Sequence, residues 1–102
     1  MITNTDCTIF RMDDNGSYIA VGTYPCMWQE VKGYEVKKYG AENADKAAVY
    51  IPDITADVQE EDYIIRGTVA PEDFLPENAL VITSVSVKDY GGELKHIQIG
   101  AR

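Results

Sequence analysis

The chain has few of the residues that catalytic and metal sites most often use. Its 102 residues include one histidine, His96, and two cysteines, Cys7 and Cys26. These are too few for a four-ligand site of Cys and His alone. A dyad of His96 with a cysteine is the enzymatic alternative, but His96 falls within the last predicted strand and is expected to face solvent or a partner. No Gly-rich phosphate loop occurs. We therefore expect no catalytic residues, no cofactor and no metal ion.

Positive charge is also scarce. Nine Lys and Arg residues stand against 17 Asp and Glu, which gives a formal net charge of −8. Phosphate binding depends on Lys and Arg, so this composition argues against specific DNA binding. It argues equally against attachment to anionic membranes. The acidity either only keeps the protein soluble or gives it a surface to which DNA does not adhere.

Long apolar runs are absent. No segment approaches the roughly 18 apolar residues of a membrane span. The first residues, "MITNTDCTIF", lack the basic start and apolar stretch of a signal peptide. We therefore expect the protein to be made in the cytoplasm with both thiols reduced. Cys7 and Cys26 are expected to be buried structural residues that could face each other across neighbouring strands.

No stretch carries a helical period of 3.6 residues over three turns. Short segments rich in β-branched and aromatic residues alternate instead with Gly, Pro, Asn and Asp. The predicted fold is all-β: one domain over residues 1–102, a small antiparallel barrel or sandwich of about six to seven strands with protruding loops. The predicted strands cover residues 7–12, 18–24, one or two within 26–40, 46–52, 62–69, 80–87 and 94–100.

Local signals give several of these elements more detail. "DDNGS" at residues 13–17 predicts a tight hairpin turn, because Asn-Gly accepts the positive φ angles that such turns need. Pro25 should interrupt the second strand, at an edge or a bulge. The strand that begins at residue 62 is expected to continue to Val69. Strict alternation predicts one face shared by Ala47, Val49 and Ile51.

Two polar connectors carry the candidate interaction residues. "EDFLPE" places two apolar side chains inside a Pro-flanked loop, and such residues either tuck under the domain or insert into a neighbour. "DITADVQEED" at residues 53–62 is acidic, but its spacing is not that of a calcium loop. It is either a solvated loop or a contact surface. The candidate residues are Glu72, Asp73, Phe74 and Leu75 in the first connector and Asp57, Glu60 and Glu61 in the second.

Four ordered blocks, covering roughly half of the chain, carry a resemblance. They are "MITNTDCTIF", "ADKAAVYIP", "EDYIIRG" and "VITSVSVKDYGGELKHIQIGAR". This set resembles a family of short proteins encoded among the structural genes of phages and prophages of Gram-positive bacteria. The sequence departs from the family pattern at Glu61, where the family has Gly, and in "SVSVKDY", where the family has "SVSDN".

Proteins of this size and setting resemble the head-completion, or stopper, proteins of long-tailed phages. The resemblance implies a non-catalytic virion protein that forms a ring, commonly of about twelve copies, below the portal and adaptor proteins. The ring would close the DNA exit channel and join the tail, and double-stranded DNA would pass without specific binding. The alternatives are another neck or minor capsid component, such as a tail-completion protein, or a monomeric β-barrel that binds a ligand or a protein.

A ring of identical copies needs two different faces on each subunit. The polar connectors could supply these faces or line the channel. The terminal hairpin, residues 79–100, is expected to complete the barrel and to offer an edge to the next protein, by strand addition or by side-chain packing.

Overall fold

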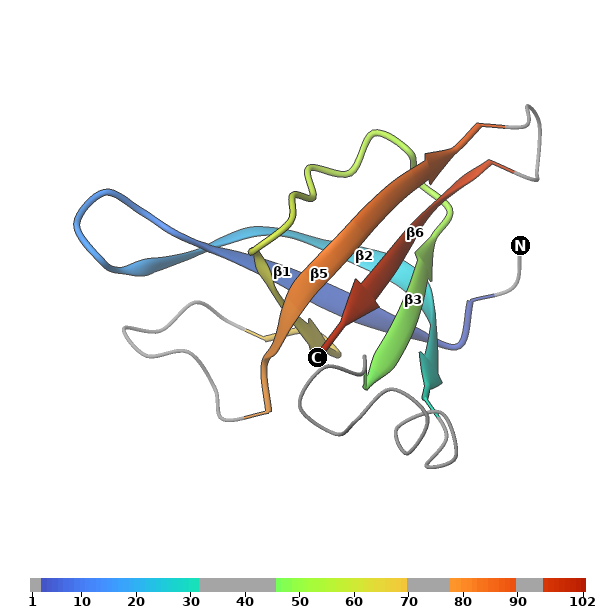
Figure 1. Ribbon diagram of the computed structural model, residues 1–102, viewed down its shortest axis with the longest axis horizontal. Coiled ribbons are helices and arrows are strands. Elements are labelled where there is room, and N and C mark those ends of the chain that lie inside the picture. The colour runs from blue at the N-terminus through green and yellow to red at the C-terminus, as the bar shows by residue number, and fades with distance from the viewer. Residues whose placement is uncertain (1–2, 32–45, 70–77, 90–94) are drawn as a thin grey trace.

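The computed structural model describes residues 3–31, 46–69, 78–89 and 95–102. These residues form six strands and no helix: β1 (Thr5–Met12), β2 (Tyr18–Glu30), β3 (Ala47–Ile51), β4 (Tyr63–Arg66), β5 (Leu80–Lys88) and β6 (His96–Ala101). The strands close into one barrel in the order β1-β2-β3-β6-β5-β4, with every neighbouring pair antiparallel (Figure 1). The predicted all-β class is confirmed, and the barrel is the form that the strands adopt.

The terminal hairpin completes this barrel, as predicted. β6 pairs with β3, where Ile99 lies opposite Val49, and β5 pairs with β4, where Val81 lies opposite Tyr63. Because β6 is hydrogen-bonded to β3 on one side and β5 on the other, it has no free backbone edge. The sequence allowed contact by strand addition or by side-chain packing; strand addition to β6 is excluded by these two pairings.

The barrel interior is filled by side chains. The predicted face of β3 is confirmed, since its three alternate residues all lie in the core. A six-strand barrel is narrow enough for side chains to fill it completely. Twelve buried residues make up this core: Cys7, Ile9, Cys26, Trp28, Ala47, Val49, Ile51, Ile64, Ile82, Ile97, Ile99 and Ala101.

The prediction that Pro25 interrupts the second strand was wrong, because β2 runs unbroken from Tyr18 to Glu30. Pro25 lies opposite Asp6, whose carbonyl accepts a hydrogen bond from the Gly67 amide at 2.6 Å on the β4 side. Asp6 and Pro25 thus form a non-hydrogen-bonded pair, so the missing proline N–H removes no β1–β2 bond. The missing N–H of Pro25 removes no bond to β3 either, because β2 pairs with β3 only from Met27 onward.

The fourth strand is shorter than predicted. β4 ends at Arg66 because Gly67 has a φ of +97°, a backbone conformation outside the strand region. Val69 therefore lies beyond the strand. Its amide donates to Thr8 Oγ1 at 3.2 Å, and Thr8 Oγ1 in turn donates to the Gly67 carbonyl at 2.7 Å. The chain leaving β4 thus folds back over the outer face of β1.

Candidate interaction surfaces

The outer end of the β1–β2 hairpin, residues 11–20, projects from the barrel as a two-stranded arm. β1 pairs with β4 only from Cys7 to Phe10, and β2 pairs with β3 only from Met27 onward. Beyond Phe10 the two strands therefore pair only with each other. Figure 1 shows this hairpin in blue, extending away from the other strands. At about 3.3 Å per residue, its tip lies roughly 13 Å past the last β1–β4 pair.

The arm ends in a turn that its own sequence stabilises. Asp13 Oδ1 accepts hydrogen bonds from the amides of Asn15 and Ser17, each at 2.9 Å. Gly16 has a φ of +82°, which glycine adopts without steric cost. The hairpin turn predicted from "DDNGS" is therefore confirmed in position, but only Gly16 takes a positive φ and Asn15 does not. Asp14 is exposed beside it, so the tip carries two carboxylates.

Apolar side chains are exposed on both faces of the arm. Met12 is 50% exposed and Ile19 is 48% exposed. Met12 lies opposite Tyr18 and Ile19 lies opposite Arg11, so the two apolar side chains point to opposite faces of the ribbon. The arm therefore offers one exposed apolar side chain on each face.

The predicted acidic connector, residues 53–62, lies across one end of the barrel. Ile54, Ala56 and Val58 pack against the core, while the residues between them are exposed. The connector thus covers this end with one face and presents acidic groups on the other. The same segment therefore closes one end of the core and forms a charged surface.

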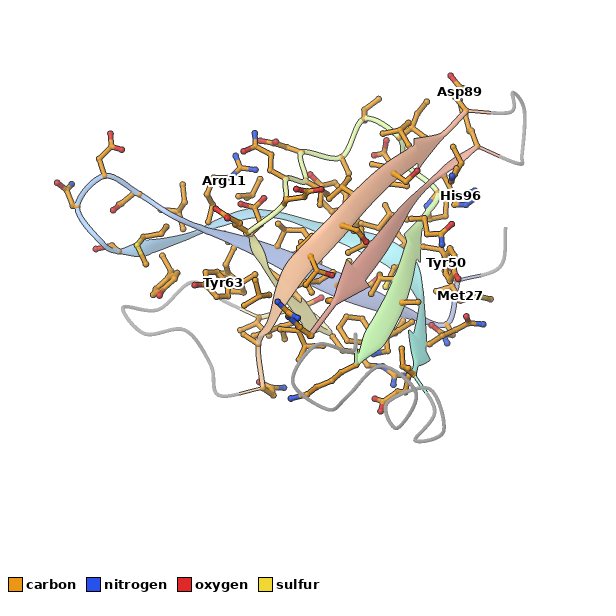
Figure 2. All side chains as sticks on the ribbon, viewed as in Figure 1. Arg11, Met27, Tyr50, Tyr63, Asp89 and His96 are labelled. Atoms are coloured by element: carbon orange, nitrogen blue, oxygen red, sulfur yellow. The ribbon has the colours of Figure 1, made fainter. Side chains whose placement is uncertain are left out.

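Arg11 holds this connector to β1. Its Nε donates to Asp62 Oδ1 at 2.9 Å, and its Nη2 donates to Asp62 Oδ2 at 2.8 Å. Two further bonds of 3.2 Å join its terminal nitrogens to the Asp57 carboxylate. The Asp62 side chain is only 5% exposed, whereas that of Asp57 is 58% exposed. We call these three residues the Arg11 clamp; Figure 2 marks Arg11 between β1 and the connector.

One guanidinium serves two carboxylates in the clamp. The carboxylates of Asp62 and then Asp57 raise the pKa of Arg11 above its ordinary value. Hydrogen bonding to Arg11 lowers the pKa of Asp57. A bidentate guanidinium–carboxylate pair fixes geometry as well as charge, so the clamp sets the position of the connector. In the described residues every buried side-chain nitrogen and oxygen has a hydrogen-bond partner.

A hollow of about 560 Å³ lies beside the clamp. It reaches from the root of the arm along the last residues of the connector to β5. Glu61, with a φ of +74°, turns the chain into β4 there, and its amide donates to the Ile82 carbonyl at 2.8 Å. The hollow is lined by Arg11, Met12, Gln59, Glu60, Glu61, Asp62, Tyr63 and Val81.

A second hollow, of about 310 Å³, lies at the far end of β4. Trp28 and Leu80 form its apolar part. Lys46 and Arg66 bring two positive charges and Glu30 one negative charge, and Ala47 and Asn78 complete the lining. Among the described residues that line it, positive charges thus outnumber negative ones, on a chain of net charge −8. We call it the basic hollow.

The predicted interaction residues fall in different places. Glu72, Asp73, Phe74 and Leu75 lie outside the described residues. Asp57 belongs to the Arg11 clamp, and Glu60 and Glu61 line the hollow next to it. The sequence reading missed Arg11, Met12 and Ile19, although an apolar residue directly before "DDNGS" and "YI" directly after it signal an apolar hairpin end.

The catalytic alternatives occupy separate parts of the barrel. Cys7 and Cys26 are free, fully buried and hydrogen-bonded to each other across β1 and β2, as expected for structural thiols. That hydrogen bond, together with burial, raises the pKa of the Cys7 thiol. His96 lies on β6 with its ring 5.9 Å from that of Tyr50, and Figure 2 shows the two side chains near Met27 at the opposite edge from the arm.

In residues 3–31, 46–69, 78–89 and 95–102, no three His, Cys, Asp or Glu side chains are grouped to hold a metal ion. The same ranges contain no helix of the length and hydropathy that a membrane crossing needs.

Comparison with known proteins places the chain in one family. The chain belongs to DUF6751, a family of unknown function, whose model matches residues 2–102. No curated protein and no solved structure matches it significantly.

Proposed function

We propose that this member of DUF6751 is a non-catalytic structural protein of a phage or prophage-derived particle. In this proposal it forms a ring at the head–tail connector, commonly of about twelve copies. The ring closes or gates the DNA exit channel and joins the tail. The protein is then located in the virion, with the portal, adaptor and tail proteins as its partners.

The observation that carries this proposal is the projecting arm. The barrel core is already filled, and yet Met12 and Ile19 are about half exposed on a hairpin outside it. An isolated two-stranded hairpin is only marginally stable, so such an arm gains stability by packing against another molecule. Side-chain contacts of this kind provide a route to assembly, because they bury apolar surface that the barrel leaves exposed.

Charge supports the same role. About twelve copies at −8 each would place roughly −100 on a ring, and like charges repel the DNA backbone. Glu60 and Glu61 add exposed carboxylates at one end of the barrel. Asp57 is engaged by Arg11, so Glu60 and Glu61 are the better candidates for a surface that faces passing DNA.

The test is assembly with the connector. The protein is mixed with the portal–adaptor complex of a Gram-positive phage whose genome encodes a member of this family, and the products are weighed by mass photometry and imaged by negative stain. We expect a ring to be added to the complex. The Met12→Ser/Ile19→Ser variant should keep its fold by circular dichroism but fail to add. The matched control is Val87→Ser, at a residue that is 57% exposed on β5 away from the arm, and it should assemble normally.

A monomer that ignores the portal–adaptor complex would contradict the connector role. Binding to tail protein alone would favour a tail-completion protein or another neck component. A protein that stays monomeric with every virion partner would favour the binding-module alternative.

A further inference from the structure

The arm and the basic hollow lie at opposite ends of β4. Phe10, where the arm begins, lies opposite Tyr63 at the start of this strand. Arg66, which lines the basic hollow, ends the strand and lies opposite Cys7. β1 runs from Cys7 toward Met12, so the arm points away from the basic hollow of its own chain. Only a second molecule can bring an arm to that site.

The arm and the basic hollow match in their apolar parts. An arm with Met12 on one face and Ile19 on the other buries both side chains only when it enters a recess, and a flat surface would cover one of them. The basic hollow offers Trp28 and Leu80 as apolar walls. Burial of apolar surface is the main favourable term in protein association.

They also match in charge. The tip of the arm carries Asp13 and Asp14, and the described lining of the basic hollow carries Lys46 and Arg66 against one carboxylate, that of Glu30. Copies with a net charge of −8 repel one another at a distance. A contact between two copies therefore needs local complementarity, which also fixes its register.

We propose that the arm of one copy enters the basic hollow of the next copy, so that the partner of both surfaces is a second molecule of this chain. The inference rests on the ring proposed above and names its subunit contact. Because the two surfaces differ, the contact is heterologous and runs head to tail. Such a contact closes into a ring when its rotation permits, and otherwise forms a filament.

Site-directed cross-linking tests this contact directly. Ser17→Cys places a thiol at the arm tip, and Asn78→Cys places one in the basic hollow; both positions are exposed. The native thiols are buried and should not react. With a short bismaleimide reagent, the double variant, alone at high concentration or bound to the portal–adaptor complex, should give a ladder of dimers, trimers and higher species. The matched control pairs Ser17→Cys with Gln98→Cys, an exposed position on β6, and should give no ladder.

A charge swap provides a second readout. Asp14→Lys and Arg66→Glu should each weaken self-association severalfold, since each places like charges together. The Asp14→Lys/Arg66→Glu double variant carries opposite charges again in every contact and should recover most of the loss. Asp14 is preferred to Asp13, whose carboxylate holds the turn.

The outcomes separate this inference from the proposed function. Rings on the portal–adaptor complex that give no ladder, or the same ladder for both cysteine pairs, would overturn the arm contact and leave the connector role standing. A specific ladder with charge-swap rescue, but no binding to the portal–adaptor complex, would keep the contact and overturn the connector role. Absence of both ladder and ring would contradict both.

Discussion

At the scale of single residues, Arg11 is the side chain that ties the acidic connector to β1, through two carboxylates of different burial. It links β1 to Asp62, which is 51 positions away and almost fully buried, and to Asp57, which is largely exposed. The two ion pairs are therefore expected to contribute unequally to stability. A buried carboxylate that loses its cation is costly, whereas an exposed one is resolvated by water.

Replacing Arg11 with Ala should lower the free energy of unfolding by about 1–3 kcal/mol, because the buried Asp62 carboxylate loses its charged partner. The measurement is urea unfolding followed by circular dichroism. Asp57→Asn is the matched control and should cost much less, since that carboxylate is exposed. Equal losses for the two variants would contradict this ranking by burial.

Acid should weaken the connector. Arg11 lowers the pKa of Asp57, and hydrogen bonds from Thr55 lower that of Asp53. In the unfolded chain both carboxyl groups have a pKa of about 4. The folded state then binds fewer protons than the unfolded state, so the stabilisation is complete above about pH 4 and is lost as the pH falls through the lowered values. The midpoint of unfolding should fall between pH 6 and pH 3. For Asp57→Asn the midpoint should depend less steeply on pH.

At the scale of elements, the β1–β2 hairpin contains two parts with different surroundings. Its inner part is a wall of the barrel, where Cys7 and Ile9 are fully buried. Its outer part has one partner strand and about half-exposed apolar side chains. The two tyrosines at the junction, Tyr18 and Tyr63, meet edge to face with ring centroids 5.4 Å apart. This contact anchors the arm where it leaves the barrel.

Hydrogen exchange should separate these parts. In the isolated protein, the amides of Met12 and Ile19 should exchange roughly tenfold or more faster than those of Val49 and Ile99 in the closed barrel. The reason is that opening the arm breaks few buried contacts, whereas opening β3 or β6 breaks the core. In an assembled ring the arm amides should slow. Arm exchange that is as slow in the monomer as in the barrel would contradict a free arm.

At the scale of the whole molecule, closure makes each strand depend on strands distant in sequence. β1 pairs with β4, and β6 lies between β3 and β5, so no half of the barrel is complete without the other. The connector over residues 53–62 then seals one end with Ile54, Ala56 and Val58. A shared core of this kind favours unfolding in one cooperative step.

Calorimetry should therefore find a single transition. For 102 residues at about 0.7 kcal/mol each, the unfolding enthalpy should be about 70 kcal/mol near 60 °C. The calorimetric and van't Hoff values should agree at protein concentrations where the chain is monomeric. A clear second transition would mean that part of the barrel folds independently.

The sequence by itself determined the features that depend on neighbouring residues. Alternation gave the buried face of β3, Asn-Gly gave the turn at residues 13–17, and composition gave the all-β class and the acidic character. Each of these follows from side-chain direction or backbone sterics within a few residues. An interaction role for the acidic connector stays a prediction; the structure places Asp57 in the Arg11 clamp and Glu60 and Glu61 in the lining of the hollow beside it.

Only the tertiary structure decided how these elements combine. It decided that the strands close into a barrel, that β2 passes through Pro25, and that Arg11 clamps Asp62 rather than facing solvent. It also decided which part of the first hairpin lies in the wall and which part projects. These outcomes depend on strand pairings between segments tens of residues apart, and no local pattern specifies which distant edges meet.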